Sequence, residues 1–557
     1  MTSPSMPSLE DPRLVAIGLG LLAHLVFKTT EPRQPRVWLL LLIGAPTALT
    51  ISVNYAFSSV TTTVLSVFTI YFATLLTSLA LYRLSPFHPL AQYPGPILHK
   101  LSNFQMVRVA LTGKRHLYIT ELHKKYGSHV RIGPNVLSVV HVDAIAATLG
   151  TKPGMPKGEM YHSLQLPNTP TSLVGTLDMA EHAEKRKSWS QGFTPAALKE
   201  YDPIIQRRTN QLVRKLEQQV GTIDLGKWIS YFTFDFMGDI VFGGGFEMIR
   251  EGDTRNLWPV IIMAMKAGSI TFAVPWVRGL ASLLPMADDF KRMLSFAAER
   301  VDIRQRRGPI SKDLFYHITD EDSVTGRNIT PPEIPPEIMV AIIAGADTTS
   351  SVLANLFYSL LRNPDVHAKL KKEIDGAFGP DEDTLDVAKL QNMVYLNACI
   401  NEALRLFPAV PTFISRSPKV GGGPVLVAGR VVPEGTNILL PFWALQRDAR
   451  YFSMPDKFWP ERWIERTFYN EKTDGSNTTF VHNQAAFCAF SQGSQQCSGK
   501  ALAYREMRVV VTMILKKFDI AFEEGYNPQD WEAGLRDDTV IVKDKLPVTL
   551  TVRARRA

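Results

Sequence analysis

The residue best suited to chemistry is Cys497, in the segment FSQGSQQCSG at positions 490–499. Glycines four residues before it and two residues after it would let the backbone approach a flat macrocycle. Residues 500–518 carry apolar side chains at helical spacing, so Cys497 should precede a helix N-terminus, whose dipole and free amide groups favour a thiolate. A thiolate on such a turn could be the axial ligand of an iron macrocycle. The alternative is an inert core cysteine, which is the common role of a lone cysteine.

A second chemically promising stretch lies on a long predicted helix. Two prolines before Glu337 predict its start, and Asn363-Pro364-Asp365 predicts its end. A helix of about 27 residues, roughly 40 Å long, would cross a large domain. Gly345, Thr348 and Thr349 interrupt its apolar sequence midway, where glycine weakens a helix and threonine can bend one. A helix kink without further function is the alternative.

The segment around Cys497 resembles the cysteine-ligand motif F-x-x-G-x-R-x-C-x-G of the cytochrome P-450 superfamily. Four of its five fixed positions are met in order, and the arginine is replaced by Gln495. The resemblance implies a fold that is mainly α with smaller β-sheets (α+β), a triangular haem domain with a long central helix. Further segments match in family order from about residue 94 onward: Pro94-Gly95-Pro96, Ala344-Gly345-Ala346-Asp347-Thr348-Thr349, Glu402 with Arg405, and FWPERW at 458–463.

The same resemblance implies a cofactor, haem b (iron protoporphyrin IX). Cys497 would be its metal ligand, and Phe490, Gly493 and Gly499 would shape the loop that binds it. Gln495 would weaken haem anchoring, because a neutral amide binds a propionate less strongly than a guanidinium does.

Other family-equivalent positions complete the expected site. His182 and Arg186, four residues apart on a helix, and Arg416 match positions whose cations bind the haem propionates. The alternative for each is a solvated surface charge. Thr348 would donate a hydrogen bond on the oxygen-binding side, and Asp347 would relay protons from solvent.

The family resemblance also implies a structural network. Glu402 and Arg405, on a predicted helix over residues 393–407, would form a buried group with Arg462. That group would lock the segment leading to the cysteine loop. The alternative is an ordinary ion pair on the helix surface.

The first ninety residues carry three apolar stretches, at 14–27, 37–57 and 60–82. The second and third reach the roughly 20 residues that span a bilayer, and the first is marginal. Basic residues flank these stretches, and the positive-inside rule places the following domain in the cytosol. We therefore predict a membrane anchor over residues 1–90 with two or three spans, and a catalytic domain over 91–557 on the endoplasmic reticulum. Buried core helices of a soluble protein are the alternative.

Composition limits the compartment and the partners. Three cysteines in 557 residues cannot build a disulfide framework, so the domain should face a reducing compartment, with Cys399 and Cys488 in its core. The net charge is +8, but we find no nucleic-acid-binding module. We find no flavin or nicotinamide motif either, so electrons would come from a separate NADPH-dependent flavoprotein reductase. It could dock on basic side chains that are otherwise an ordinary solvated face: Lys185, Lys187, Lys500, Arg505, Arg508, Lys516 and Lys517.

The resemblance implies a monooxygenase that inserts one oxygen atom from O2 into a lipophilic small molecule. Mostly apolar family-equivalent segments, such as 161–174 and 410–414, would line the pocket. The proline-rich stretch before residue 97 is similar to that of fungal members, many of which act in secondary metabolism, for example on terpenoids. The alternatives are a haem-thiolate isomerase or dehydratase without a reductase, and a non-enzymatic membrane haem sensor. The pair Asp347 and Thr348 argues against an isomerase, which needs no proton relay.

Overall fold

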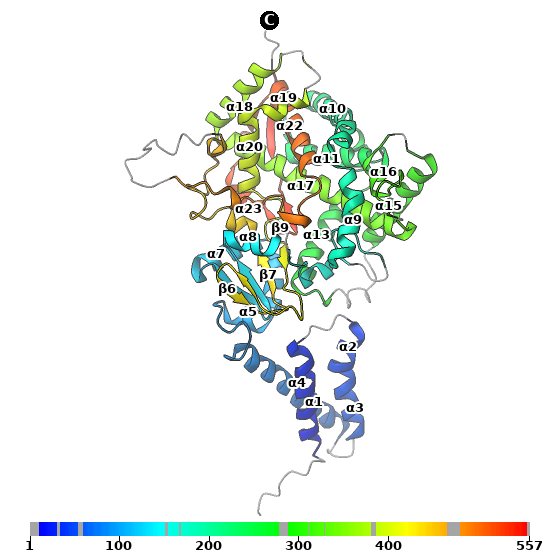
Figure 1. The fold of residues 1–557 in the computed structure, drawn as a ribbon, viewed down its shortest axis with the longest axis vertical. Coiled ribbons are helices and arrows are strands. Elements are labelled where there is room, and N and C mark those ends of the chain that lie inside the picture. The colour runs from blue at the N-terminus through cyan, green and yellow to red at the C-terminus, as the bar shows by residue number, and fades with distance from the viewer. Residues whose placement is uncertain are drawn as a thin grey trace, which may run out of the picture.

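The computed structural model describes residues 11–29, 34–53, 59–150, 154–165, 169–277, 288–309, 311–327, 329–379, 382, 386–464 and 480–553. In these ranges the chain is mainly helical with small β-sheets, which agrees with the class expected from the sequence. Figure 1 shows a broad body and a slim bundle of N-terminal helices that projects from it.

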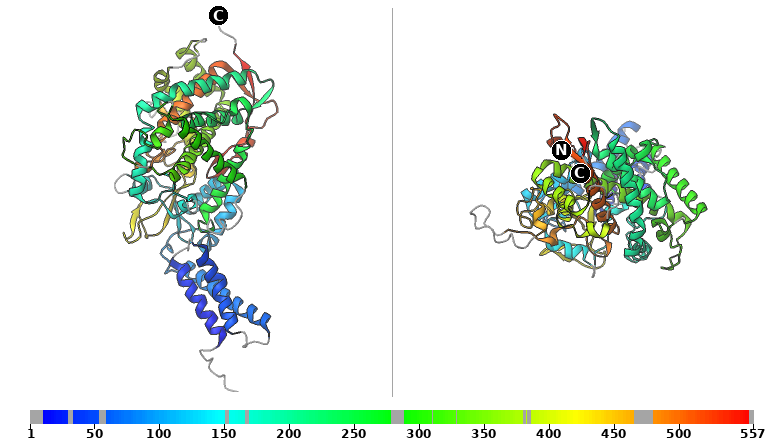
Figure 2. Two further views of the ribbon diagram at one scale, coloured as in Figure 1. Left: turned by 90° about the vertical axis from the view of Figure 1, so that its right-hand side faces the viewer. Right: turned by 90° about the horizontal axis from the view of Figure 1, so that it is seen from above.

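The N-terminal bundle consists of α1 (Pro12–Thr29), α2 (Pro35–Leu39), α3 (Ala45–Ser52) and α4 (Val60–Leu84), with a π-helical segment between α2 and α3. Helix α1 packs along α4 through a small apolar cluster that includes Ala23, Phe27 and Tyr71. Figure 2 shows the same bundle from the side, standing clear of most of the body.

One of the predicted spans has a counterpart among the described N-terminal helices. Among the described N-terminal helices, α4 alone is long and apolar enough to cross a membrane. The second apolar stretch is a shorter helix over Arg36–Ser52, and residues 54–58 lie outside the described part of the chain. Helix α17 (Ile334–Arg362) also passes the length and composition test, but 72% of its apolar window is buried, as expected of a core helix. The described N-terminal residues thus contain one candidate span, and the number of two or three stays a prediction.

Helices account for most of the body. The three helices expected at 335–361, 393–407 and 500–518 agree with the observed ones to within one residue at each end. The described helices of the body besides α17 are α5 (Ile97–Leu101), α6 (Phe104–Thr112), α7 (Arg115–Tyr126), α8 (Val142–Leu149), α9 (Met179–Gln191), α10 (Pro195–Glu217), α11 (Leu225–Phe242), α12 (Met248–Glu251), α13 (Leu257–Ala273), α15 (Asp288–Arg307), α16 (Leu314–Ile318), α18 (Pro364–Ala377), α19 (Val387–Asn392), α20 (Val394–Leu406), α21 (Phe442–Leu445), α22 (Lys500–Lys517) and α23 (Gln529–Gly534).

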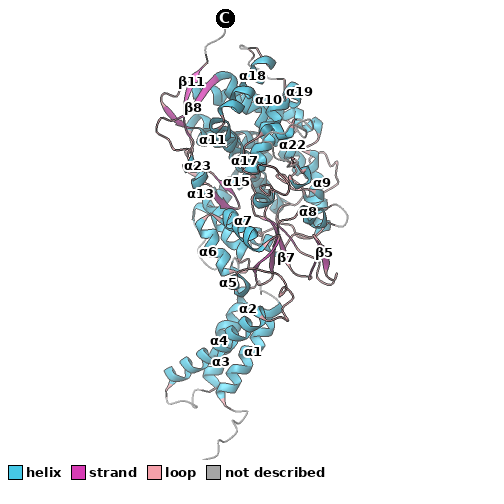
Figure 3. Ribbon diagram, turned by 90° about the vertical axis from the view of Figure 1, so that its left-hand side faces the viewer, coloured by secondary structure: helices cyan, strands magenta, loops and turns pink. Residues whose placement is uncertain are grey.

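The strands are short and lie among the helices (Figure 3). The largest sheet has the order β1-β2-β7-β4, in which β2 and β7 are parallel and the other neighbours antiparallel. A three-stranded sheet has the order β3-β11-β8, and two hairpins pair β9 with β10 and β5 with β6. The strands are β1 (His129–Gly133), β2 (Val136–Val139), β3 (Thr222–Asp224), β4 (Ile414–Arg416), β5 (Val425–Val427), β6 (Arg430–Val432), β7 (Asn437–Leu440), β8 (Phe518–Phe522), β9 (Arg536–Asp538), β10 (Val540–Val542) and β11 (Pro547–Val552).

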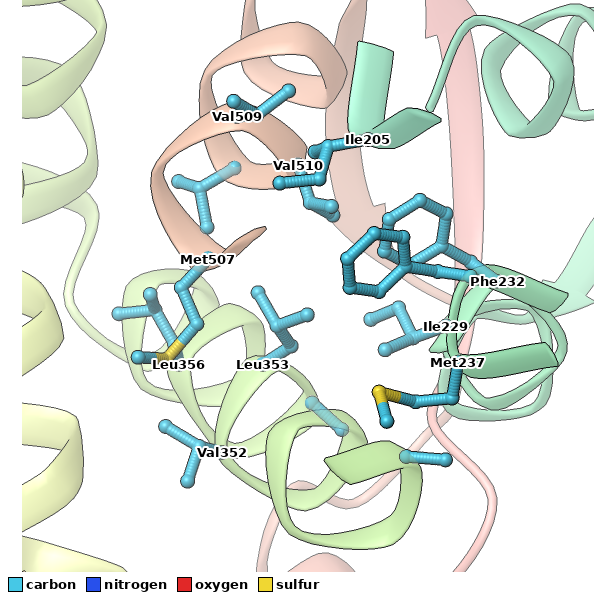
Figure 4. Close-up of a cluster of buried hydrophobic side chains, with 14 of the residues drawn as sticks. Ile205, Ile229, Phe232, Met237, Val352, Leu353, Leu356, Met507, Val509 and Val510 are labelled. Atoms are coloured by element: carbon cyan, nitrogen blue, oxygen red, sulfur yellow. The ribbon is translucent and has the colours of Figure 1, made fainter. Parts of the chain in front are cut away.

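Helix α17 runs through the largest apolar core. Its C-terminal half buries side chains on all faces, which explains why its sequence there is almost uninterruptedly apolar or small. Figure 4 shows this half packed between α22 and α11, with α10 beside them. The labelled side chains that meet there are Val352, Leu353 and Leu356 of α17, Met507, Val509 and Val510 of α22, Ile229, Phe232 and Met237 of α11, and Ile205 of α10. The core therefore fixes α17 and α22, the two helices that carry the candidate chemistry, against each other.

Candidate haem-thiolate site

The turn before α22 places Cys497 by its backbone. The Cys497 amide donates to the carbonyl of Phe490 at 2.9 Å, and Gly499 lies just before the first residue of α22. Gly493 has a φ of +75°, and a Cβ at this position would lie 1.7 Å from the carbonyl oxygen of Leu149. Any other residue would clash with that backbone, so Gly493 is required for the path of the loop.

Cys497 is an exposed residue, yet protein atoms crowd around its thiol. Burial raises the pKa of its thiol, and the Gly499 amide and the Arg186 charge oppose this shift without reversing it. The Gly499 and Lys500 amides at the helix N-terminus favour the thiolate, but burial outweighs them in the protein without metal; a bound metal ion would deprotonate the thiol. Burial also raises the pKa of Cys399, and that of Cys488 to about 12, and both lie in the core as predicted.

A hollow of about 580 Å³ opens beside Cys497, between α9, the start of α10 and α22. Its wall combines basic and aromatic side chains with the backbone of the cysteine loop. The lining residues are Arg186, Ser190, Phe193, Pro195, Leu198, Gln391, Gln496, Cys497, Ser498, Lys500, Ala501, Tyr504, Arg505 and Arg508. The cysteine can thus be approached from the surface over a broad basic opening.

Four basic side chains gather near α9 and β4. His182 and Arg186 lie one turn apart on α9, and Arg416 ends β4, where it forms a β-bridge with Lys157. The exposed fractions are 6% for His182, 3% for Arg416 and 8% for Lys157. Buried placement excludes a solvated surface charge for these three residues. Lys157 was not identified from the sequence.

The contacts of this basic cluster are almost all to backbone carbonyls. Arg186 donates to the carbonyl of Gln496 at 2.6 Å, and Arg416 to that of its neighbour Ser415 at 2.8 Å. The Lys157 ammonium donates to the carbonyls of residues 173 and 174 at 2.9 and 2.8 Å. In the described part of the chain, none of Lys157, Arg186 and Arg416 forms an ion pair with a carboxylate.

Repulsion among these basic side chains contributes to the low pKa values of His182 and Lys157. Burial, with the charges of Lys157 and Arg186 among others, lowers the pKa of His182 to about 3. Burial, with the charge of Arg416, also lowers the pKa of Lys157 to about 7, although Glu337 opposes the shift. His182 is therefore neutral at pH 7 before a carboxylate binds, and it would offer a propionate an N–H donor. Buried cations without a bound carboxylate suit a ligand that brings its own carboxylates, as haem does.

Gln495 stands where the family motif has arginine. Its side-chain Oε1 is buried and has no hydrogen-bond partner in the described residues. An amide oxygen cannot donate to a propionate, so this side chain would have to offer its NH2 group instead. At the one position that departs from the motif, the described residues thus leave the buried Oε1 of Gln495 without a hydrogen bond.

The middle of α17 has a local opening. Ala344 is exposed and Thr348 is partly exposed, although this helix is otherwise largely buried. The Thr348 hydroxyl donates to the carbonyl of Ala344 at 2.6 Å, the contact by which threonine bends a helix. A Cβ on Gly345 would come within 2.5 Å of the Met237 sulfur, so the glycine also lets α11 pack closely.

Asp347 lies on the buried side of the same turn, with 4% of its surface exposed. Burial raises the pKa of Asp347 to about 6, and the charge of Lys543 opposes this shift. Asp347 can therefore gain and lose a proton near neutral pH, as a proton relay must. Lys543 was also not identified from the sequence, because a single lysine after a C-terminal strand has no distinguishing pattern.

Glu402, Arg405 and Arg462 form the buried network that the sequence predicted, and all three side chains are completely inaccessible. The carboxylate accepts from Arg405 at 2.8 and 2.9 Å and from Arg462 at 3.0 Å. Arg405 also donates to the carbonyls of residues 446 and 455. The network therefore ties α20 to the segment that leads to the cysteine loop, and the alternative of a surface pair is wrong.

The predicted basic docking patch is only partly available. Lys185 is buried and pairs with Glu181 and Glu337, so it belongs to the interior. Four others have surface partners, while Lys500 is exposed and Arg508 donates to Asn397 at 2.7 Å. The partnered residues are Lys187 with Glu184, Arg505 with Asp202, Lys516 with the carbonyl of Glu382, and Lys517 with Glu217.

Comparison with known proteins identifies the family. Residues 91–551 match the Cytochrome P450 family. This chain belongs to the cytochrome P450 family. It is 33% identical over 490 residues to the cytochrome P450 monooxygenase FCK2 of Fusarium pseudograminearum, covering 86% of this chain and 85% of that protein. It is 32% identical over 486 residues to averantin hydroxylase of Dothistroma septosporum (85% and 88% covered), and 29% identical over 491 residues to tryprostatin B 6-hydroxylase of Neosartorya fischeri (87% and 86%).

Membership of the cytochrome P450 family establishes the type of reaction and the type of cofactor. The protein is a P450 monooxygenase, with relatives among fungal hydroxylases of secondary metabolism. The family implies a haem-thiolate iron cofactor, a reductase as redox partner and a small-molecule substrate.

Proposed function

We propose that this P450 uses haem b to insert one oxygen atom from O2 into a lipophilic small molecule of fungal secondary metabolism. The observation that carries the proposal is Cys497 on its glycine-shaped turn, next to a buried cluster of cations that lacks carboxylate partners. Terpenoids remain one candidate substrate class.

In this proposal Cys497 ligates the iron, while Phe490, Gly493 and Gly499 shape the loop beneath the cofactor. Arg186, Arg416 and Lys157 would hold the propionates by charge, and His182 would contribute a neutral N–H donor. When bound, haem supplies oxygen activation, and thiolate ligation favours cleavage of the O–O bond.

Residues in the middle of α17 would then deliver protons to the oxygen-binding side of the haem. Thr348 would turn its hydroxyl from the Ala344 carbonyl toward the oxygen-binding side, while Asp347 would pass protons from solvent to that side. A buried aromatic group supports a lipophilic substrate: Phe272 stacks on Phe413 at 3.8 Å, and Tyr161 lies edge-on to Phe413 at 5.8 Å. The rings would exclude water and bind apolar surface.

The partner would be an NADPH-dependent flavoprotein reductase that docks over the hollow beside Cys497. Lys500 is the exposed cation of this hollow, and Arg508 stacks on Tyr504 at 5.2 Å. Tyrosine and arginine are the residues that most often anchor interfaces. Because several neighbouring basic residues are already paired, docking would depend on this small group rather than on a wide positive field.

We also propose that residues 1–90 form a membrane anchor and that residues 91–557 form the catalytic domain on the cytosolic face of the endoplasmic reticulum. Helices α1 and α4 expose many large apolar side chains, which a bilayer would cover: Leu14, Val15, Ile17, Leu21, Leu22, Leu25, Val60, Val64, Leu65, Leu76, Leu81 and Leu84. Trp38 of α2 stacks on Trp276 of the body at 4.1 Å, which suits an aromatic contact near the membrane surface.

Expression in membranes together with a reductase tests the function. The wild type should give the red-shifted Soret band of a thiolate-ligated ferrous–CO complex, and it should consume O2 only with NADPH and reductase. Cys497→Ser should lose the band, because the soft anionic ligand is gone, whereas Cys488→Ser should keep it.

A band that survives in Cys497→Ser and disappears in Cys488→Ser would refute the ligand assignment. Product formation without O2 or reductase would indicate an isomerase or dehydratase. Haem binding without any turnover, across a panel of terpenes, fatty acids and aromatics, would favour a sensor.

A further inference from the structure

A half-buried lysine, Lys543, contacts α17 one helical turn after Asp347. Lys543 follows β10 directly, and its ammonium donates to the hydroxyl of Ser350 at 2.8 Å. That hydroxyl in turn donates to the backbone carbonyl of Asp347 at 3.0 Å. The ammonium also lies over the ring of Trp258 in α13, 5.1 Å from its centre. Lys543 thus joins β10, α13 and α17 at the turn that carries the proton-relay candidate.

The two opposite charges are close but not in contact. No ion pair within 4.0 Å joins Asp347 to Lys543 in the described residues, yet each affects the pKa of the other. Besides Asp347, the charged group that acts on Lys543 is Asp224 at the start of α11. Asp224 already accepts the amides of Lys227 and Leu546, at 3.2 and 3.0 Å, as a helix cap. Of the two carboxylates, Asp347 has the larger effect on Lys543.

We propose that Lys543 is a positioning residue for proton delivery: it keeps the Asp347 carboxylate ionised and so sets the pH range in which Asp347 serves Thr348. The proposal rests on the monooxygenase function proposed above. Lys543 need not touch substrate or cofactor, since it acts through the charge of Asp347 and through the Ser350 hydroxyl.

The charges define the direction of the effect. Burial raises the pKa of Asp347 to about 6 even with Lys543 present, so removal of the cation must raise it further. An opposite charge within about 4–6 Å lowers a carboxyl pKa by about one unit or more. Burial lowers the pKa of Lys543 to about 8, and Asp347 and Asp224 oppose that shift. Between these two values both side chains are charged, and outside them the pair loses one of its charges.

The first measurement is the titration of the Asp347 carboxyl itself. The infrared band of the protonated Asp347 carboxyl is obtained by subtracting the spectrum of the same protein with the added substitution Asp347→Asn. The proteins are measured in membranes, with and without haem. The midpoint should lie near pH 6 in the wild type. In Lys543→Met it should rise by at least about one pH unit, a tenfold change in proton affinity, and Lys543→Arg should restore it.

A matched control is Lys545→Met, which removes the same charge from an exposed position two residues away and should leave the midpoint unchanged. The second measurement is the pH profile of coupling, the share of NADPH electrons recovered in product rather than in peroxide. Its acid limb should move by the same amount as the carboxyl midpoint in Lys543→Met, and return in Lys543→Arg.

An unchanged midpoint in Lys543→Met would overturn the proposal and leave Lys543 as a packing partner of Trp258. A moved midpoint with an unmoved coupling profile would also overturn it, because Asp347 would then not set proton delivery. If the wild type lacks the thiolate band and reductase-dependent turnover, the proposed function fails, and the infrared titration still decides whether Lys543 controls Asp347. Should Lys543→Met not fold, Lys543→Gln replaces it with a neutral side chain that can still donate to Ser350.

Discussion

Replacing Glu402 with glutamine probes the buried network ahead of the cysteine loop. The Glu402 carboxylate is inaccessible and accepts from five donors: two on Arg405, one on Arg462, the amide of Trp459 at 2.9 Å and the indole of Trp463 at 2.9 Å. Glutamine keeps the shape of the side chain, but it removes the charge that balances two guanidinium groups and turns one acceptor into a donor.

The expected cost follows from this geometry. Removing one partner of a buried ion pair destabilises a protein by about 3–5 kcal/mol, since the remaining charge is left without compensation. For a domain of this length the unfolding entropy is on the order of 1 kcal/mol per kelvin. The Glu402→Gln variant should therefore lose its haem-binding structure at a temperature roughly 3–5 °C lower. We expect irreversible unfolding, so both proteins are scanned at the same rate.

The pH dependence gives a second check. Burial would raise the pKa of Glu402, but the charges and hydrogen bonds of Arg405 and Arg462 outweigh it and hold the pKa below its usual value. A carboxylate with a depressed folded pKa contributes stability above its unfolded pKa, about 4.3, and loses it as pH falls through the folded pKa. The gap between wild type and Glu402→Gln should be constant near neutral pH and narrow in acid.

Glu461→Gln is the matched control, because Glu461 lies in the same segment but pairs with the exposed Lys369 at 2.6 Å. Because the exposed Lys369 stays solvated when the pair is lost, the cost should be smaller, about 1 kcal/mol. If Glu402→Gln is no less stable than Glu461→Gln, or if its deficit is independent of pH in acid, the buried network does not hold this segment as we infer.

Three further variants address the site. Thr348→Ala should leave haem binding intact but divert NADPH electrons to peroxide, measured as peroxide per NADPH; unchanged coupling would reduce Thr348 to a helix bend. Gln495→Arg should slow haem transfer to an acceptor protein about fivefold, since a charge-assisted contact exceeds a neutral one by on the order of 1 kcal/mol; faster transfer would mean that the site is built around the amide. Lys157→Met should speed transfer of haem, yet not of its propionate diester, relative to wild type; equal acceleration for both would show that Lys157 acts by packing alone.

Short-range patterns in the sequence were sufficient for the elements that carry the motifs. The apolar spacing of α17, α20 and α22, with prolines and a glycine at their starts, predicted their ends to within one residue. The positive φ of Gly493 and its close contact with the Leu149 backbone require glycine at this position, which makes the cysteine loop recognisable in the sequence. These features are local, so a single sequence contains them.

Contacts between segments far apart in the chain could not be predicted from the sequence. Lys157 meets Arg416, and Lys543 meets Ser350, across hundreds of residues, and neither lysine has neighbours that mark it. The pairing within the docking patch was hidden for the same reason, because the partners of Arg505 and Lys517 lie on α10. Charge counting along a helix cannot show which cations the fold has already paired.

Helix α17 links the parts of the site into one frame. At its N-terminal turn the buried Glu337 accepts the Leu173 amide at 2.9 Å and the Trp189 indole at 3.1 Å. The Leu173 carbonyl in turn accepts the ammonium of Lys157, so this helix fixes the loop that positions the basic cluster.

The middle of α17 carries Asp347 and Thr348, and its C-terminal half packs against α22, which follows Cys497. Propionate anchoring, proton delivery and metal ligation would thus share one rigid helix. Because a helix in a packed core transmits displacement along its length, a change at Glu337 should reach the cysteine loop as well as the loop that it binds directly.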